Sequence, residues 1–309
     1  MDKTKEENKK PELVTNQTYS DGDVVENQIL EFFKKKKTSK EIKQYIKDNP
    51  SWPIKYHLSP DRHNLLSWYN FKEKDSLLEI GGGCGALTGL FLDKGLNVTT
   101  VELSKRRANI IRERFKNKEN LEVLDGNIHD KELKGKYDYV TLIGVLEYSG
   151  KYGKGDNPYL DMIKESKSFL KKNGTLIIAI ENRFGLKYWR GAPEDHTNIL
   201  FDSLEGYPNY QGIRTFGKKE LTDLLIEGGF EKDSISFYYP LPDYKFCYEI
   251  FSDEYLPSEN HSVSHSVYPS PHPTENEILF DEVLVSKGLQ KNNLFGEFAN
   301  SFLLIIKNE

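Results

Sequence analysis

Cysteine is scarce in this sequence: Cys84 and Cys247 are the two among 309 residues. Two cysteines are too few for a disulfide framework, which excludes the small disulfide-rich secreted proteins and favours a reducing compartment. The sequence also lacks a long apolar run, since none reaches the roughly 20 residues that span a bilayer. Its first residues, Met1 to Asn8, lack the apolar core of a signal peptide. We therefore expect a cytoplasmic protein with no membrane span.

A surplus of positive charge is missing as well. The chain has 43 Lys and Arg against 48 Asp and Glu, a formal net charge of −5. Nucleic acid is therefore not expected as a partner, because a phosphate backbone favours a basic protein face.

The most informative segment is a glycine-rich stretch that follows an apolar run. Leu77 to Ile80 reads as a buried strand, Gly81-Gly-Gly-Cys-Gly-Ala86 as a tight turn, and the next residues have helical spacing. Gly81, Gly83 and Gly85 would let a ligand lie directly against the main chain at the start of a helix. This pattern predicts a nucleotide-binding turn, and it also fits the relaxed dinucleotide fingerprint.

Two acidic residues help to distinguish a dinucleotide ligand from a positively charged one. Glu79 lies on the strand, two positions before the first glycine. An anion there is unfavourable beside a pyrophosphate and favourable beside a positively charged ligand. A second predicted strand, 96–102, ends at Glu102, whose carboxylate could accept both ribose hydroxyls. A nicotinamide dehydrogenase remains an alternative if the argument from Glu79 is wrong.

With these motifs the chain resembles the class I S-adenosylmethionine-dependent methyltransferases from about Asp75 to Phe237. The motifs are Leu78-Glu-Ile-Gly-Gly-Gly-Cys-Gly85, Thr100-Val-Glu102 and the fourth-strand segment Tyr137 to Tyr148. The resemblance implies a methyltransferase with S-adenosylmethionine as cofactor. Besides the acids and glycines above, it implies cofactor contacts from Leu103, Asn127, Ile128, Gly144 and Tyr56. Asn127 stands where the family usually has an acid at the adenine, and Asp125 is the other candidate for that contact.

Strands that alternate with helices predict an α/β fold with a doubly wound, mostly parallel sheet. The resemblance makes this a seven-stranded Rossmann-like methyltransferase fold. We expect a disordered tail (1–18), an N-terminal helical cap (19–74), a cofactor-binding core (75–240), an insertion (241–300) and a final core strand (301–309). The insertion could be a lid or the arm of a homodimer, and the sequence leaves both open.

Candidate catalytic residues follow the fourth and fifth strands. A hydroxyl acceptor needs a base, because an alcohol is a weak nucleophile at neutral pH. Asp195 could orient the imidazole of His196 for this role, and Glu147 is the second choice. Aromatic and charged side chains after the fifth strand predict an acceptor groove. These residues are Glu181, Asn182, Arg183, Tyr188, Trp189 and Arg190.

We expect no metal site. His261, His265 and His272 are close in sequence, but their Ser, Val and Pro neighbours are typical of a flexible loop rather than of a rigid ligand set.

A further resemblance extends over nearly the whole chain, from about Tyr19 to Ile306. The stretches 19–23, 52–60 and 180–189, with Glu194-Asp-His-Thr197, look like a bacterial subgroup of these methyltransferases often found with glycosyltransferases of surface polysaccharide assembly. It implies O-methylation of a glycan or nucleotide sugar and a glycosyltransferase partner. A methyltransferase acting on RNA or protein, and a non-catalytic cofactor-binding scaffold, are the alternatives.

Overall fold

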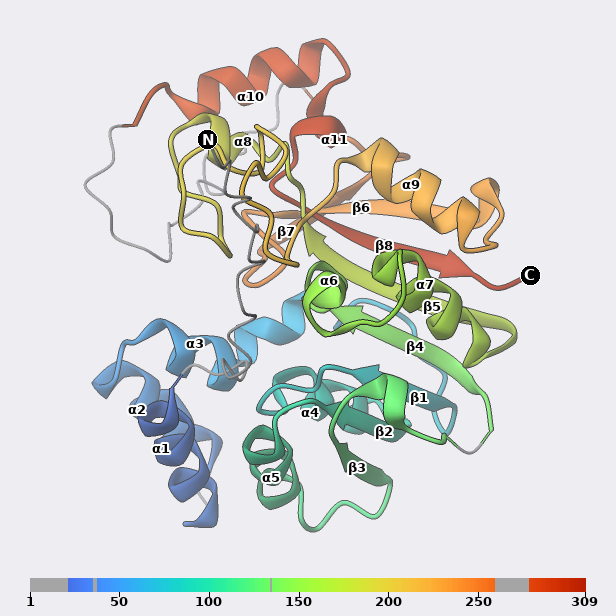
Figure 1. Cartoon of the computed structure of the whole chain (residues 1–309). Helices are drawn as coiled ribbons and strands as arrows, with labels where there is room; N and C mark the ends of the chain where they lie inside the picture. The colour runs from blue at the N-terminus through green and yellow to red at the C-terminus, as the bar shows by residue number, and fades with distance from the viewer. Residues whose placement is uncertain (1–21, 36–37, 134, 259–277) are drawn as a thin grey trace, which may run out of the picture.

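One mixed β-sheet forms the centre of the computed structural model, which describes residues 22–35, 38–133, 135–258 and 278–309 (Figure 1). The strand order is β3-β2-β1-β4-β5-β8-β6-β7. Strands β1 to β5 run parallel, β8 is antiparallel to β5 and β6, and β7 is antiparallel to β6. The strands are β1 (Ser76–Ile80), β2 (Asn97–Glu102), β3 (Leu121–Asp125), β4 (Tyr137–Ile143), β5 (Leu170–Glu181), β6 (Ile235–Leu241), β7 (Glu249–Ser252) and β8 (Ser301–Lys307).

The predicted α/β fold with a doubly wound, mostly parallel sheet is confirmed, with one correction to the strand count. The sheet has eight strands rather than seven. The additional strand is β7, which pairs with Tyr238 to Leu241 of β6 at the edge of the sheet. It lies within the predicted insertion. Because β7 is four residues long, its sequence has no clear strand pattern, and only the neighbouring edge of β6 makes it a strand.

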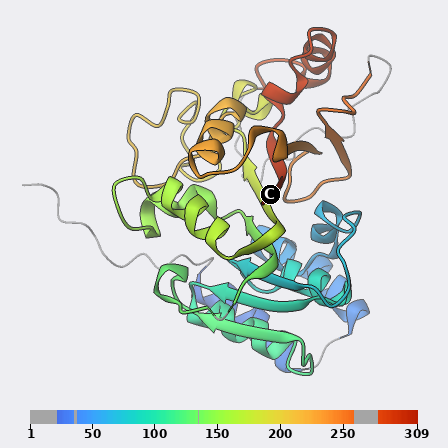
Figure 2. The ribbon, with the colours of Figure 1, turned by 90° about the vertical axis from the view of Figure 1, so that its right-hand side faces the viewer.

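Helices cover both faces of the sheet. Successive strand residues point to opposite faces, so Leu77 packs in one apolar core and Leu78 in the other. The Leu77 face is covered by α4 (Ala86–Asp93) and the 3₁₀ helix η1 (Pro60–Leu65), and the Leu78 face by α7 (Pro158–Ser168) and α9 (Lys218–Glu227), which lie side by side in Figure 2. The remaining elements after β2 are α5 (Lys105–Arg114), η2 (Ile128–Asp130), η3 (Leu146–Tyr148), α6 (Ser149–Tyr152), α8 (Leu186–Trp189), η4 (Lys232–Ser234), α10 (Glu282–Lys291) and α11 (Phe295–Phe298).

Local sequence signals explain where several helices begin. Ser104 is the N-cap of α5 and Asn157 the N-cap of α7, each with a side-chain oxygen that accepts a backbone N–H of the first turn. Pro158 then occupies the first turn of α7, where its missing N–H costs nothing. Both helices therefore begin at residues whose side chains favour a helix start.

Before the sheet, the chain forms α1 (Asp23–Lys34), α2 (Ser39–Asp48) and α3 (Trp52–Leu58). Their apolar side chains, including Ile29, Phe32 and Ile54, form a third core that also contains Ile110 of α5. In Figure 1 these helices lie beside α5, next to the glycine-rich turn. The predicted tail, residues 1–18, lies outside the described residues.

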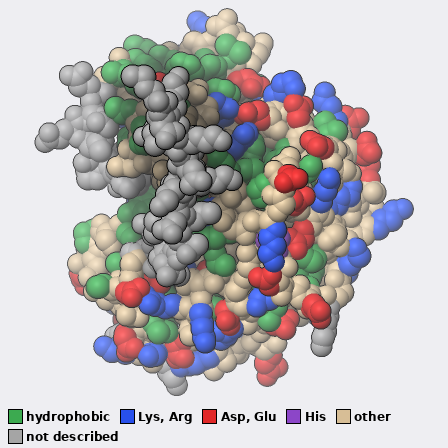
Figure 3. Space-filling view, viewed as in Figure 1, with side chains coloured by type: hydrophobic (Ala, Val, Ile, Leu, Met, Phe, Trp, Pro, Cys, Tyr) green, Lys and Arg blue, Asp and Glu red, His purple; other side chains and the backbone are tan. Residues whose placement is uncertain are grey.

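The insertion presents an apolar surface around α10. Ile278, Leu279 and Leu284 are exposed there, and Figure 3 shows apolar side chains gathered over this helix. Over the rest of that view, acidic and basic side chains are interspersed. Within the described ranges, none of the helices combines the length and apolar character needed to cross a lipid bilayer.

Candidate active site

A cavity of about 800 Å³ opens at the carboxyl ends of β1, β2 and β4. Ligands of doubly wound sheets bind at this edge. Most of the predicted cofactor residues line it: Tyr56, Gly81, Gly83, Glu102, Leu103, Asn127, Ile128 and Gly144. The structure therefore brings together motifs that lie up to about 90 residues apart in the sequence.

The glycines shape the floor of this cavity. Gly81 has a φ of +83°, and an added Cβ would lie 2.4 Å from Cγ2 of Val145, so a side chain would clash. Gly85, with a φ of +82°, is the N-cap of α4 and does not line the cavity. A Cβ on Gly85 would lie 2.8 Å from the Phe115 ring, so this glycine permits helix packing rather than ligand contact.

The Glu102 side chain, at the end of β2, forms a hydrogen bond with the glycine turn. One carboxylate oxygen accepts the backbone N–H of Gly83 at 2.7 Å, and the other accepts that of Ser104 at 2.8 Å. The side chain is buried at the cavity wall. Each carboxylate oxygen can accept more than one hydrogen bond, so both remain able to bind ribose hydroxyls. The glycine floor and this carboxylate fit a nucleoside ligand.

Replacement of Glu102 by Ala should weaken the binding of S-adenosylhomocysteine, the product form of the cofactor, by about 1 to 3 kcal/mol, the range of lost charged hydrogen bonds. The measurement is a calorimetric titration. Glu122→Ala is the matched control, because Glu122 is an exposed carboxylate on the adjacent strand β3. An unchanged affinity in Glu102→Ala would contradict the ribose assignment.

Glu79 is buried beside the turn. Thr88 donates a hydrogen bond to its carboxylate at 2.5 Å, and the side chain borders a smaller pocket that shares Tyr56, Gly81 and Gly83 with the main cavity. Burial raises its pKa from 4.5 to about 7, although hydrogen bonds from Thr88 and Thr100 act in the opposite direction. In the free protein, the protonated Glu79 side chain therefore contributes to the free energy of unfolding at low pH. This contribution is lost as the pH rises from about 4.5 to about 7.

The same pKa predicts pH-dependent cofactor binding. If the Glu79 carboxylate faces the ammonium group of the ligand, affinity for S-adenosylhomocysteine should rise by about tenfold between pH 6 and pH 8, as the ionised fraction rises. Glu79→Gln should bind more weakly at pH 8 and with much less dependence on pH. Calorimetry at several pH values measures both. A wild-type affinity that falls with pH would contradict this role.

The two candidates for the adenine contact have different partners. The amide of Asn127 donates to the Tyr152 carbonyl at 2.8 Å and accepts the His129 N–H at 3.2 Å, while the residue still lines the cavity. Asp125 forms an ion pair with Arg112 at 2.6 Å and does not line the cavity. Sequence reasoning missed Ser149 and Tyr152 as lining residues, although they follow the fourth-strand motif directly.

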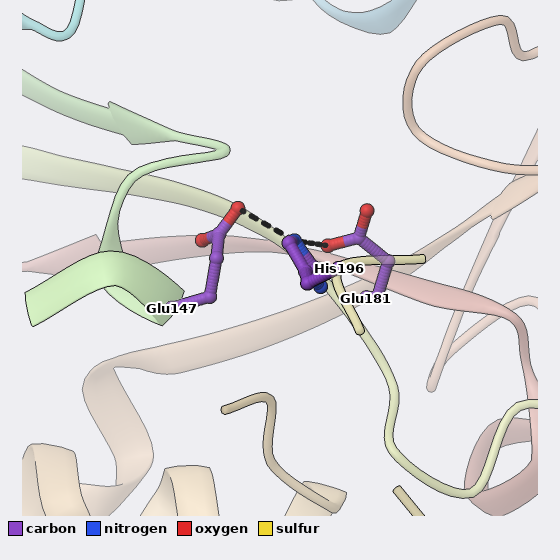
Figure 4. A group of neighbouring side chains, drawn as sticks. All are labelled: Glu147, Glu181 and His196. Atoms are coloured by element: carbon purple, nitrogen blue, oxygen red, sulfur yellow. Dashed lines mark ion pairs between the residues drawn. The ribbon is translucent and has the colours of Figure 1, made fainter. Parts of the chain in front are cut away.

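A second buried group of polar side chains lies next to this cavity. His196 Nε2 faces Glu147 Oε1 at 3.8 Å and Glu181 Oε2 at 3.9 Å (Figure 4). We call Glu147, Glu181 and His196 the polar centre. Glu147 follows β4 and Glu181 ends β5, so the parallel strands bring both carboxylates to one edge. The His196 ring packs edge-on against Tyr148, which lines the cofactor cavity.

The partner expected for His196 is corrected by the structure. The carboxylate of Glu194 is the hydrogen-bond partner of His196 Nδ1, with Oε1 at 2.9 Å, and its Oε2 accepts the backbone N–H groups of His196 and Thr197. Asp195 instead pairs with Lys187 at 2.7 Å and Lys245 at 3.0 Å. The physical reason is the turn formed by residues 194–197, in which the Glu194 carboxylate binds the backbone N–H groups of the two residues after Asp195. Consecutive side chains in this turn point in different directions.

Charge in the polar centre favours a protonated imidazole. Burial by itself would lower the pKa of His196, but the carboxylates of Glu181, Glu194 and Glu147 outweigh it and hold this pKa well above its ordinary value. Burial also raises the pKa of Glu181, against the attraction of Lys245 and His196. At neutral pH the imidazole is therefore charged, which makes it a poor proton acceptor in this state.

Most residues of the predicted acceptor groove form contacts within the protein and do not line a groove. Asn182 donates to the carbonyls of Glu297 and Ala299, Arg183 pairs with Glu220, and Arg190 with Glu282. Trp189 is partly exposed and donates to the Phe184 carbonyl, while Tyr188 is fully buried. Of this set, Glu181 lies in the polar centre. The correction has a simple cause: segments outside residues 182–190 supply most of their partners, with Glu282, Glu297 and Ala299 in the insertion and Glu220 on α9.

Sequence reasoning also missed Lys245 and Asp243. Lys245 bonds Glu181 and Asp195, and Asp243 bonds the buried ammonium group of Lys187 at 3.1 Å. Both residues follow β6 in the insertion, about 60 positions from the residues they contact. No local pattern in the sequence indicates these contacts.

Comparison with known proteins agrees with this architecture. Residues 52–235 match the methyltransferase domain family. The chain is 41% identical over 65 residues to a probable ribosomal RNA small subunit methyltransferase A of Methanococcoides burtonii, covering 21% of this chain and 24% of that protein. It is 35% identical over 72 residues to ribosomal RNA small subunit methyltransferase A of Fusobacterium nucleatum, covering 23% and 27%. The chain thus spans about a quarter of the length of these curated relatives.

Among solved structures, a chain from the complex between the Haloferax volcanii Trm112 methyltransferase activator and the putative methyltransferase is similar in fold. The TM-score is 0.51 at 14% identity, covering 87% of this chain and 97% of that chain. A possible histamine N-methyltransferase from Thermotoga maritima has a TM-score of 0.46 at 18% identity, covering 91% and 100%. The family match covers more than half of the sequence, so this chain belongs to the methyltransferase domain family. Its cofactor is S-adenosylmethionine, as the motifs predict.

Proposed function

We propose that this protein transfers the methyl group of S-adenosylmethionine to a hydroxyl of a small-molecule acceptor, with a carbohydrate of surface glycan biosynthesis as the first candidate. The observation that carries the proposal is the polar centre. Its carboxylates and imidazole are buried at the ends of β4 and β5, and Tyr148, which lines the cofactor cavity, contacts the His196 ring. An acceptor oxygen held there would lie beside the cofactor site.

The chemistry requires alignment and removal of one proton. When bound, S-adenosylmethionine supplies an electrophilic methyl group. The cavity residues, above all Glu102 and the glycine turn, hold the cofactor, and the polar centre holds the acceptor hydroxyl. Alignment of two bound reactants is the larger contribution to rate in such a transfer.

Glu147 is the proposed proton acceptor. Its Oε1 faces His196, while its Oε2 is buried and has no hydrogen-bond partner among the described residues. Glu181 is less suited, because Lys245 already bonds its Oε1. The charged imidazole of His196 would stabilise negative charge on the acceptor oxygen, with Glu194 fixing the ring orientation. Asp195 would act indirectly, by holding Lys187 and Lys245 in place.

The choice of a carbohydrate rests on the sequence resemblance to methyltransferases found with glycosyltransferases, which also makes a glycosyltransferase a proposed partner. An RNA or protein acceptor and a non-catalytic scaffold are the alternatives. The curated relatives named as ribosomal RNA methyltransferases match only about a quarter of their length, which gives RNA little support.

The test is methyl transfer from radiolabelled S-adenosylmethionine to a panel of nucleotide sugars, oligosaccharides, small phenols, RNA and protein. Label recovered in an O-methyl ether of a sugar would support the proposal. Label in a phenol would support the hydroxyl chemistry but contradict the carbohydrate acceptor. Label in RNA or protein would replace the small-molecule acceptor. Cofactor binding with no labelled product from any acceptor would favour the scaffold.

A further inference from the structure

The polar centre has a geometry that hydrogen bonding does not explain. The distances from His196 Nε2 to Glu147 Oε1 and Glu181 Oε2 are 3.8 and 3.9 Å, and both exceed hydrogen-bond length. The ligand atoms of the three residues all lie within 4.8 Å of one another. Figure 4 shows the two carboxylates on either side of the ring, both directed at the same nitrogen. The three side chains are thus joined by long ion pairs and surround a common point.

The two distances to His196 Nε2 lie in the range found between ligands of one metal ion. With metal–ligand bonds of about 2.0 to 2.2 Å, two neighbouring ligand atoms of one ion lie roughly 3 to 4 Å apart. The three side chains come from different parts of the chain, so their convergence is a product of the tertiary structure.

Two buried carboxylate oxygens without a hydrogen-bond partner among the described residues point to a missing ligand. Glu181 Oε2, the atom that faces His196, is buried and has no hydrogen-bond partner in the described part of the chain. Glu147 Oε2 is in the same state, and the two glutamates are 0% and 1% exposed. Buried oxygens of this kind are costly unless a proton donor or a cation satisfies them.

The surroundings are those of a ligated histidine. Glu194 binds Nδ1 of His196 at 2.9 Å, which leaves Nε2 as the nitrogen that faces the carboxylates. A carboxylate behind a histidine is the usual support of a metal ligand, since it fixes the ring and raises its basicity. On binding, the ion would replace the Nε2 proton of the metal-free protein, so that the imidazole is neutral and the ion supplies the positive charge. Around the centre, carboxylates outnumber lysines. The carboxylates are Glu147, Glu181, Glu194, Asp195 and Asp243, and the lysines are Lys187 and Lys245.

We propose that Glu147, Glu181 and His196 bind a divalent transition-metal cation such as Mn²⁺, and that an open coordination position of this ion receives the acceptor hydroxyl. One imidazole with two carboxylates favours such an ion over Ca²⁺ or Mg²⁺. Three protein ligands leave positions free for a substrate oxygen. The second part rests on the proposed function: the bound hydroxyl loses its proton to Glu147 Oε2 and becomes the nucleophile.

The first experiment measures the metal without any reaction. Full-length protein is treated with a chelator, dialysed, and titrated with MnCl₂ while the electron paramagnetic resonance signal of free Mn²⁺ is followed. We expect one tightly bound ion per chain. Pulsed measurements on the complex should show coupling to the nitrogen of one imidazole. Absence of binding at millimolar Mn²⁺, or a bound ion with no nitrogen coupling, would overturn the proposal.

Variants then locate the ion. Glu147→Gln and His196→Gln should each weaken Mn²⁺ binding at least about tenfold, and Glu194→Gln by about 10- to 100-fold through loss of support at Nδ1. Glu113→Gln, on the distant helix α5, is the control and should bind normally. Titration with S-adenosylhomocysteine verifies that each variant is folded. Equal Mn²⁺ binding by the folded ligand variants and the control would overturn the assignment.

The two experiments show separately whether the metal site is wrong and whether the proposed acceptor is wrong. If Mn²⁺ binds as described but no hydroxyl compound is methylated, the proposed function fails and the metal site stands. If a hydroxyl acceptor is methylated at the same rate with and without the bound ion, the role of the ion in acceptor binding is overturned.

Discussion

Replacement of Glu147 by Gln is expected to lower the rate of methyl transfer by about 10²- to 10⁴-fold, the usual contribution of a positioned acid or base. The amide keeps the size of the side chain but cannot take a proton from the acceptor. Because Glu147 does not line the cofactor cavity, the affinity for S-adenosylhomocysteine should be unchanged. The rate is measured with saturating cofactor and the acceptor found in the transfer assay.

The matched control is Glu113→Gln, an identical change on α5 at a carboxylate that pairs with Lys116 in the turn after this helix. Its transfer rate should equal that of the unmodified protein. A small shift of KM with unchanged kcat in Glu147→Gln would mean that Glu147 helps to bind the acceptor and is not the proton acceptor. Partial recovery in Glu147→Asp would support proton transfer, since the carboxylate is kept at a less favourable distance.

Replacement of Arg107 by Met is expected to reduce the free energy of unfolding by about 3 to 5 kcal/mol, the cost of breaking a buried ion pair. Arg107 Nε on α5 donates to Glu26 Oε1 on α1 at 2.7 Å, and their side chains are 3% and 1% exposed. The substitution leaves the Glu26 carboxylate buried without this partner. Arg106 lies 3.7 Å from Glu26 and compensates in part, which favours the lower end of the range.

Denaturant unfolding without cofactor measures this change, and hydrogen exchange of α1 shows whether the N-terminal helices open first. The control is Arg106→Ala, one residue earlier, whose partner Asp23 lies at the surface; solvent screening makes such a pair weak, so stability should hardly change. A double variant, Glu26→Leu with Arg107→Met, should recover much of the lost stability because neither member of this pair is left buried without the other. Failure of this recovery would mean that packing, not charge, dominates at this contact.

Much of the fold could be predicted because its signals are local. The N-caps Ser104 and Asn157, the glycine turn and the apolar strands each depend on a few neighbouring residues. Once strands and helices are known to alternate, the parallel sheet can be predicted as well, because right-handed crossovers place the carboxyl ends of its strands at one edge. That is why Glu102 and Asn127, both chosen from the sequence, line one cavity in the structure.

The polar centre could be predicted only in part. His196, Glu147 and Glu181 stand out because they follow parallel strands. The residue that supports His196 could not be chosen, because Glu194 and Asp195 are adjacent acids and the geometry of a turn determines which one reaches the ring. The expectation of no metal also came from local reasoning. It considered His261, His265 and His272, which lie outside the described residues. The set proposed above, Glu147, Glu181 and His196, comes from three separate segments and was not considered.

The sequence by itself determined the class of this protein: periodicity, caps and glycine spacing act over short distances and are sufficient for a cofactor-binding α/β sheet. Only the tertiary structure decided which side chains meet at its edge. The additional strand β7, the contacts of Lys245 with Glu181 and Asp195, and the approach of both carboxylates to one nitrogen depend on segments separated by many residues. Contacts at such separation arise from the packing of the whole chain, and no short stretch of sequence encodes them.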